Sequence, residues 1–232
     1  WIRSFSCTEG NELIPRIANE KGLKTMVGAW ISADKARNEA EINALVRLAK
    51  EGLVDIAAVG NEVLLRNELT EQEIIGYIER VKAQLPEGIP VGYVDAYYQF
   101  LERPELVNAC DIIPINCYPF WEGADNSHAL LFLQQMYALA TEAGQDKKVI
   151  VAETGWPSAG KSVEAAQPSA ENAMKYFINA QDWAKANGIE MFYFSSFDES
   201  WKVVHEGEVG TRWGLWDKHE QPKFESQNVK TN

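Results

Sequence analysis

The sequence predicts an α/β protein in which strands and helices alternate and the strands close into a (β/α) barrel. Apolar β-branched runs alternate with amphipathic segments along the chain, which is typical of a parallel sheet covered by helices. Nearly every run also ends in a polar or aromatic residue. A barrel gathers all these ends on one face, whereas an open sheet uses only those near one switch point. The end residues are Ser6, Trp30, Glu62, Asp95, Tyr118, Glu153 and Phe197, with Glu199 beyond it.

The expected strands and helices follow from residue composition and from the turn and capping residues that end each segment. The predicted strands are β-branched runs that stop at turn residues, and they cover residues 1–6, 23–30, 54–60, 89–94, 111–118, 149–154 and 191–197. The predicted helices cover residues 11–21, 34–51, 70–85, 103–108, 126–143 and 169–186. Gly22 and Gly52 follow two of these helices where C-caps prefer glycine, and Thr70 with Glu73 forms a capping box. The polar tail, 217–232, is expected to lie along the barrel without a full helix.

Composition limits the class of protein. With 232 residues and 46% hydrophobic content, the chain is expected to form one domain over residues 1–232 and to be monomeric. No stretch reaches the roughly 18 to 20 apolar residues of a membrane span. The net charge of −12 argues against a nucleic-acid partner, because phosphate binding needs clustered Lys and Arg. A neutral sugar polymer raises no such objection.

The cysteines and histidines do not suggest a metal site. The chain has an odd number of cysteines, Cys7, Cys110 and Cys117, and they lack CxxC spacing. We therefore expect them to be reduced, buried packing residues. His128, His205 and His219 stand singly and are expected on the surface or in loops.

Two carboxylates suggest chemistry. Glu153 ends the run 149–154, and Glu62, preceded by Asn61, follows the run 54–60. They can meet only if both strands belong to one sheet. Two converging carboxylates are what glycoside hydrolysis needs. The alternative is that each forms a structural ion pair with an Arg or Lys.

Four motifs, in order along the chain, resemble those of family 17 glycoside hydrolases. They are Gly60-Asn61-Glu62, Asn116-Cys117-Tyr118-Pro119-Phe120, Ala152-Glu153-Thr154-Gly155-Trp156-Pro157-Ser158 and Phe197-Asp198-Glu199-Ser200-Trp201-Lys202. These enzymes are β-1,3-glucanases and β-glucan glucanosyltransferases, and the resemblance covers about residues 1–216. The short loops and the Cys7-Thr8-Glu9 turn are more similar to the bacterial branch of the family.

The resemblance implies a (β/α)8 TIM barrel whose first strand-helix unit is absent from this sequence, so that residues 1–6 correspond to the second strand. We therefore expect about 25 to 40 further residues before Trp1. The resemblance also implies a retaining enzyme that acts on β-1,3-glucan by double displacement without metal or cofactor, located outside the cell or in the periplasm. Glu153 would be the nucleophile, Glu62 the acid/base, and Asn61 a donor to the sugar 2-hydroxyl.

Further substrate contacts are expected around this pair. The Tyr118 hydroxyl would hold Glu153 in line, and Glu199 with Lys202 would contact the innermost sugar; the alternative for the last two is a surface ion pair. Aromatic faces stack on pyranose rings, although large aromatics also pack in cores. We expect sugar contacts from Trp30, Tyr98, Phe120, Trp156 and Trp201 and packing from Trp213 and Trp216.

Three alternatives remain open. A hydrolase without transfer is one, although Tyr97, Tyr98, Phe100, Phe120 and Trp121 cluster after two strands and favour binding of a sugar acceptor. A noncatalytic glucan-binding barrel is another. Residues 155–162 also satisfy the phosphate-loop pattern GxxxxGK[ST], but Trp156 is bulky and Pro157 lacks an N–H group.

Overall fold

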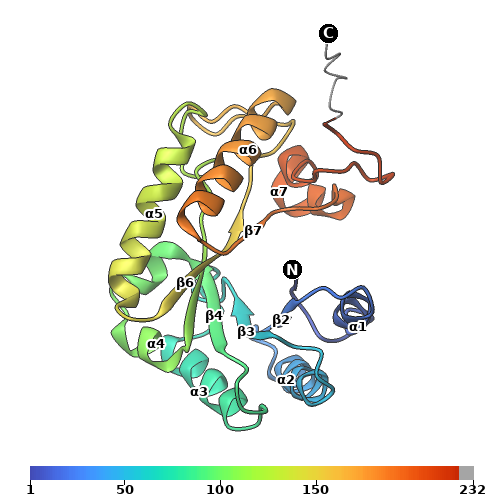
Figure 1. The fold of residues 1–232 in the computed structure, drawn as a ribbon, viewed down its shortest axis with the longest axis vertical. Coiled ribbons are helices and arrows are strands. Elements are labelled where there is room, and N and C mark those ends of the chain that lie inside the picture. The colour runs from blue at the N-terminus through green and yellow to red at the C-terminus, as the bar shows by residue number, and fades with distance from the viewer. Residues whose placement is uncertain (225–232) are drawn as a thin grey trace. The chain divides into compact units, whose positions relative to one another are not determined.

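The seven strands form one sheet whose order follows the chain, from β1 to β7 (Figure 1). The structure is a computed structural model, and it describes residues 1–224. The strand pairs from β1 to β5 are parallel, as predicted. The strands are β1 Ile2–Ser4, β2 Thr25–Ala29, β3 Ile56–Asn61, β4 Val91–Ala96, β5 Ile112–Asn116, β6 Lys148–Thr154 and β7 Met191–Tyr193.

A helix follows each strand, so the predicted alternation is confirmed. The helices are α1 Leu13–Glu20, α2 Lys35–Lys50, α3 Glu71–Lys82, α4 Pro104–Ala109, α5 Ala129–Gly144, α6 Ala170–Asn187 and α7 Val203–Gly210, with the 3-10 turns η1 Tyr97–Phe100 and η2 Ser200–Lys202. The sequence prediction missed α7, which contains Gly207 in a non-helical conformation. It also made β7 too long, because that strand ends at Tyr193.

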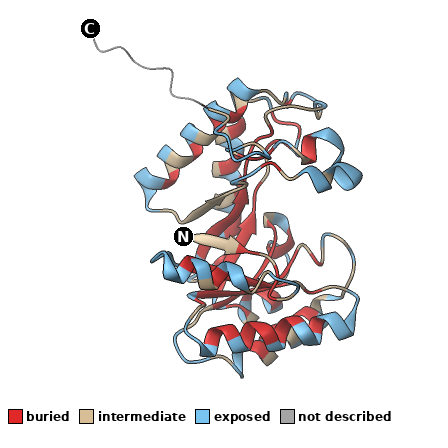
Figure 2. Ribbon diagram, turned by 90° about the vertical axis from the view of Figure 1, so that its right-hand side faces the viewer, coloured by how far each residue is buried: buried red, intermediate tan, exposed pale blue. Residues whose placement is uncertain are grey.

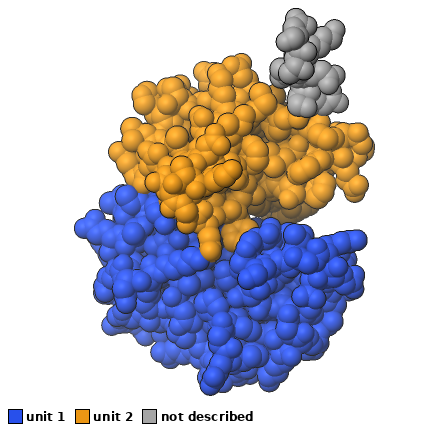
Figure 3. Space-filling view, in the orientation of Figure 1, with its two compact units in different colours: residues 1–116, 136–152 blue, residues 117–135, 153–232 orange. Residues whose placement is uncertain are grey.

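The chain divides into two compact units, coloured separately in Figure 3. Unit 1 comprises residues 1–116 and 136–152, and unit 2 comprises residues 117–135 and the chain from 153 onward. Helix α5 and strand β6 each contribute to both units. The expectation of one domain over residues 1–232 stays a prediction.

The core of unit 1 lies between the sheet and its helices. Strands β2 to β5 are buried at every position (red in Figure 2), because a parallel sheet in an α/β fold is covered on both faces. Helix α2 presents Ile42, Leu45 and Ala49 to this core. Helix α3 begins with the predicted capping box of Thr70 and Glu73.

Helix α2 also buries two polar residues that the apolar pattern did not predict. The Glu41 carboxylate accepts hydrogen bonds from the Ser6 hydroxyl at 2.6 Å and from the backbone N–H groups of Cys7 at 2.8 Å and Trp30 at 3.1 Å. Asn38, one turn earlier, accepts from the Ser32 N–H at 2.9 Å and donates back to the Ser32 carbonyl at 2.8 Å. These contacts fasten the loops that follow β1 and β2.

Unit 2 contains α6, α7 and an aromatic core. Ser169 caps the start of α6, and Gly188 ends it with a φ of 65°. Trp216 pairs with Phe197 and with Pro222, so the first part of the predicted tail forms bridges and no helix. The rest of that tail, residues 225–232, lies outside the described residues.

Other sequence predictions can also be compared with residues 1–224. Cys7, Cys110 and Cys117 are free and buried as predicted, and burial raises the pKa of the Cys110 thiol to about 11. The three histidines are exposed. Within the described chain, no helix is long and apolar enough to cross a membrane.

We expect Glu41→Gln to lower the free energy of unfolding by about 2 to 4 kcal/mol, because an amide has one acceptor oxygen and its NH2 group would face buried donors. Urea denaturation followed by circular dichroism measures this. Glu39→Gln is the control, since Glu39 lies on the same helix but pairs with Arg80 at the surface. Equal small effects of the two changes would show that Glu41 does not stabilise these loops.

Candidate functional site

The end of β3 presents Asn61 and Glu62 on a tight turn in unit 1. Gly60 has a φ of 84° and Glu62 a φ of 54°, so both lie in the left-handed region on either side of Asn61. For a residue with a side chain this conformation costs on the order of 1–3 kcal/mol. The Glu62 N–H donates to the Val94 carbonyl at 2.8 Å, which ties the turn to β4.

Asn116, at the end of β5, binds both Asn61 and Glu62. Its amide donates to Glu62 Oε1 at 2.8 Å and to Asn61 Oδ1 at 3.4 Å. Arg3 on β1 donates to the same Asn61 oxygen at 2.7 Å. Because a guanidinium only donates, the contacted atom must be the oxygen of Asn61, and its NH2 group is directed elsewhere. Sequence reasoning missed these roles of Arg3 and Asn116, although Asn116 begins the second of the four motifs.

Asp95 on β4 holds the loop that follows Glu62. The Asp95 carboxylate is fully buried and accepts from the Leu64 N–H at 3.1 Å and from the Tyr93 hydroxyl. Burial raises the pKa of Asp95, while these hydrogen bonds act in the opposite direction. The sequence prediction placed Asp95 at a strand end, and the structure shows that its side chain serves the backbone of the neighbouring loop.

Glu153 lies on β6, where its side chain belongs to unit 2. The side chain is mostly buried, and its Oε2 accepts a hydrogen bond from the Tyr118 hydroxyl at 2.7 Å. The Glu153 carbonyl accepts from the Cys117 N–H at 2.8 Å, so the residue that follows β5 is hydrogen-bonded to β6. The predicted contact between Tyr118 and Glu153 is therefore present.

Aromatic packing fixes the Tyr118 ring. The ring lies edge-on to Trp213, with centroids 5.2 Å apart, and to Phe194 at 6.3 Å. Gly155, two residues after Glu153, leaves room for this arrangement, since a Cβ there would overlap the Phe194 carbonyl oxygen. Trp213 is buried, as its predicted packing role requires.

Glu199 and Lys202 form an ion pair across η2, with Nζ and Oε2 2.9 Å apart. Lys202 also lies over the Phe194 ring at 4.0 Å, and only 13% of its side chain is exposed. The Glu199 side chain is 33% exposed, and the contact of this pair with a sugar stays a prediction. Burial raises the pKa of Glu206 on α7, Lys202 lowers it, and Glu199 and Glu153 raise it further, so these groups form one electrostatic cluster. Sequence reasoning missed Glu206.

Two of the aromatic residues predicted to contact sugar are buried. Phe120 is 0% exposed and packs against Trp156 and Trp213, with ring centroids 5.3 and 5.6 Å away. Trp156 is 1% exposed and donates its indole N–H to the Gln167 carbonyl at 3.0 Å. Neither ring offers a face to a sugar, because core packing covers both. The structure thus corrects the prediction for Phe120 and Trp156.

The remaining aromatic candidates are accessible to different extents. Trp201 is 64% exposed on η2, and Tyr98 is 40% exposed on η1. Trp30 is half-buried, with the Arg66 guanidinium 4.8 Å above its ring. Sugar contacts by these three residues stay predictions.

The phosphate-loop interpretation of residues 155–162 is wrong. The helix that must begin at the loop's lysine is absent, because α6 starts only at Ala170. Ser158 instead binds the Arg212 carbonyl through its N–H at 2.9 Å and its hydroxyl at 3.1 Å.

The chain is similar to known glycoside hydrolases. Residues 1–214 match the BtgE/BtgC glycoside hydrolase domain family. Curated relatives include a glucan 1,3-beta-glucosidase of Arthroderma benhamiae, 27% identical over 96% of this chain and 78% of its own length, and one of Saccharomyces cerevisiae, 28% identical over 96% and 79%. A crystal structure of the family 17 β-1,3-glucanosyltransferase from Rhizomucor miehei is 31% identical and covers 95% of this chain and 82% of its own, with a TM-score of 0.87.

The fold and the strand-end carboxylates define a glycoside hydrolase domain. The chain belongs to glycoside hydrolase family 17. Its fold is the (β/α)8 TIM barrel of that family, of which residues 1–224 supply seven strands. The assignment to the bacterial branch stays a prediction.

We expect Phe120→Ala to lower the free energy of unfolding by about 3 to 5 kcal/mol, because it removes a buried aromatic ring from the core. Trp201→Ala, at an exposed ring, should change it by less than about 0.5 kcal/mol. Thermal or urea unfolding measures both. Equal stabilities of the two variants would show that the Phe120 ring does not stabilise this core.

Proposed function

We propose that this protein is a retaining glycosidase and glucanosyltransferase that acts on β-1,3-glucan. The observation that carries the proposal is that Glu62 and Glu153 each accept a hydrogen bond from a neutral donor of their own unit. The Asn116 amide binds Glu62, and the Tyr118 hydroxyl binds Glu153. Both glutamates stand at the carboxyl ends of strands of one sheet, where barrels of this class carry their active sites.

The proposed reaction has two displacements. The Glu153 carboxylate attacks the anomeric carbon, and Glu62 gives its proton to the leaving glycosidic oxygen. The glycosyl group is then bound to Glu153 as an ester. Glu62, now ionised, takes a proton from water or from a sugar hydroxyl, which attacks the same carbon and releases Glu153. Chemistry of this kind needs no cofactor.

The proposed role of Asn61 follows from its amide orientation. Arg3 and Asn116 both donate to its oxygen, which leaves the NH2 group as the donor for a ligand. A donor to the sugar 2-hydroxyl forms a contact that strengthens as oxocarbenium character develops. Asn61 therefore serves the transition state in this proposal.

The proposed substrate class is based on the known relatives of the chain and on its net charge. The curated relatives are glucan 1,3-beta-glucosidases, and a second Rhizomucor miehei structure is an active-site mutant in complex with laminaritriose. A neutral β-1,3-glucan suits a protein with a net charge of −12. A noncatalytic glucan-binding barrel is the competing function, and it would bind such a glucan without turnover.

We expect azide to distinguish the two glutamates. Glu153→Ala should abolish turnover, and azide entering the vacated space should give an α-glycosyl azide from an activated β-glucoside. Glu62→Ala should stall on poor leaving groups and yield the β-azide from the covalent intermediate. Nuclear magnetic resonance of the products identifies the anomer. Exchanged anomers would exchange the two roles, and unchanged turnover in both variants would refute the proposal.

Transfer to sugar acceptors is the second part of the proposed function. Once Glu153 carries the glycosyl group, a bound acceptor competes with water by orientation, which can supply effective molarities far above the concentration of water. The exposed rings of Tyr98 and Trp121 are suitable acceptor platforms, with 40% and 43% exposure. Phe100 and Phe120, also predicted on the acceptor side, are buried and do not serve this role.

We expect products longer than the substrate when a β-1,3-gluco-oligosaccharide is incubated at millimolar concentration. Trp121→Ala should lower the ratio of transfer to hydrolysis about fivefold, as expected for the loss of about 1 kcal/mol of stacking. Chromatography of product lengths over time measures the ratio. Trp1→Ala, which removes another exposed ring, is the control. Only shorter products at all concentrations would indicate a hydrolase without transfer.

A further inference from the structure

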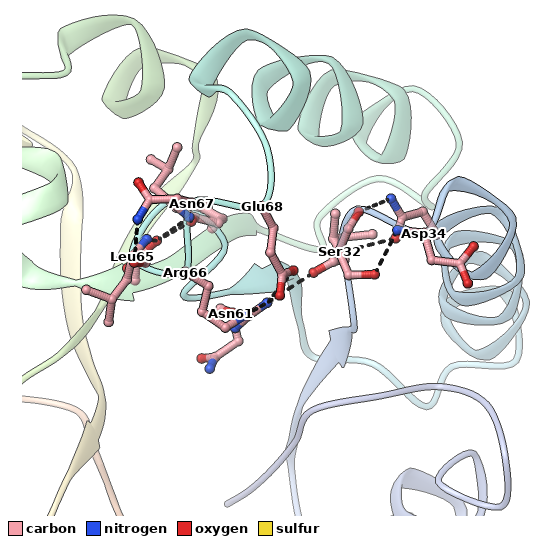
Figure 4. A network of polar contacts seen from close by, with 12 residues as sticks. Ser32, Asp34, Asn61, Leu65, Arg66, Asn67 and Glu68 are labelled. Carbon is pink, nitrogen blue, oxygen red and sulfur yellow. Dashed lines mark hydrogen bonds and ion pairs between the residues drawn. The ribbon is translucent and has the colours of Figure 1, made fainter. Parts of the chain in front are cut away.

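Arg66, on the loop after β3, reaches back to the residue that precedes the candidate acid/base. Its Nη1 donates to the carbonyl oxygen of Asn61, and its backbone N–H donates to the carbonyl oxygen of Glu62 at 2.9 Å. Figure 4 shows the Arg66 side chain between Asn61 and Glu68. Arg66 thus binds the carbonyl groups of the two peptide units that flank the Glu62 Cα.

The guanidinium is itself held from three directions. Glu68 accepts from Nε at 2.8 Å and from Nη2 at 3.1 Å, which is the bidentate geometry of a well-ordered pair. Arg66 also stacks over the Trp30 ring at 4.8 Å, and its Nη2 lies 3.4 Å from the Ile31 carbonyl oxygen. The side chain therefore links the end of β2 to the end of β3.

The turn requires such support. Glu62 has a φ of 54°, a conformation that persists only where the surroundings determine it. The peptide unit between Asn61 and Glu62 carries the Asn61 carbonyl, so rotation of this unit would move both side chains relative to Asn116. The hydrogen bond from Arg66 fixes that carbonyl directly.

Stability alone is a weak reason for this arrangement. The side chains of Arg66 and Glu68 are 27% and 30% exposed, and partly exposed ion pairs contribute little to folding. Orientation is the more demanding requirement, because a general acid must reach the leaving oxygen within hydrogen-bond distance.

We propose that Arg66 is a positioning residue for proton donation by Glu62, and that Glu68 holds Arg66 in place. The proposal rests on the proposed function, since it takes Glu62 as the acid/base. Arg66 touches no reacting atom. Its effect on the reaction passes through the Asn61 carbonyl.

The test compares two substrates in Arg66→Gln by kcat/KM, which reports the first displacement. A laminari-oligosaccharide with a natural sugar leaving group needs proton donation, whereas its dinitrophenyl β-glycoside needs almost none. We expect a 10- to 100-fold loss on the natural substrate and less than about threefold on the activated one. Arg66→Lys should recover part of the loss, because its ammonium can still donate to the carbonyl, and Glu68→Gln should show a smaller loss of the same kind.

The matched control is Arg80→Gln, which breaks a bidentate pair with Glu39 at the surface of the same unit. This change should leave kcat/KM unchanged on both substrates. Equal losses on both substrates in Arg66→Gln, or no loss on either, would overturn the positioning role. If the proposed function itself were wrong, kcat/KM of Glu62→Ala would not depend on the leaving group. This result distinguishes failure of the proposed function from failure of the positioning role.

Discussion

Buried carboxylates that accept backbone N–H groups hold the loops at the carboxyl ends of the strands in unit 1. Glu41 binds the loops after β1 and β2, and Asp95 binds the loop after β3. Loops of this kind carry N–H groups without partners in the sheet, and a buried acceptor satisfies several at once. The positions of Trp30, Asn61 and Glu62 depend on these contacts, because each residue lies within or beside a fastened loop.

Periodicity and local signals predicted most of the fold. The strands from β2 to β6 and the helices from α2 to α6 were recognised because each combines a regular apolar pattern with a clear end, such as the capping box of Thr70. Helix α7 was missed because Gly207 interrupts it. Glu41 was missed because a carboxylate inside an apolar helix stripe has no local signal, and its four hydrogen-bond donors come from two other segments of the chain.

Sequence reasoning predicted some residues of the candidate site and missed others, for a similar reason. The motifs contain Glu62, Glu153, Asn61 and Tyr118, whose roles stay predictions, and the predicted contact of Tyr118 with Glu153 is present. Residue type could not separate Phe120 and Trp156, which are in the core, from Trp121 and Trp201, which are exposed. Alternation does not apply in loops, so only the folded chain distinguishes a packed ring from an exposed one. The contact of Arg3 with Asn61 likewise joins two strands that are distant in sequence, because the two residues lie 58 positions apart.

The glycines beside the candidate site affect how the activities of variants in this region are interpreted. A Cβ at Gly155 would overlap the Phe194 carbonyl oxygen, and one at Gly214 would overlap the Asp198 backbone nitrogen. Neither position has space for any other amino acid. In a saturation scan scored by activity, Gly155 would therefore score as poorly as a residue that reacts with the substrate, although what it supplies is an empty volume.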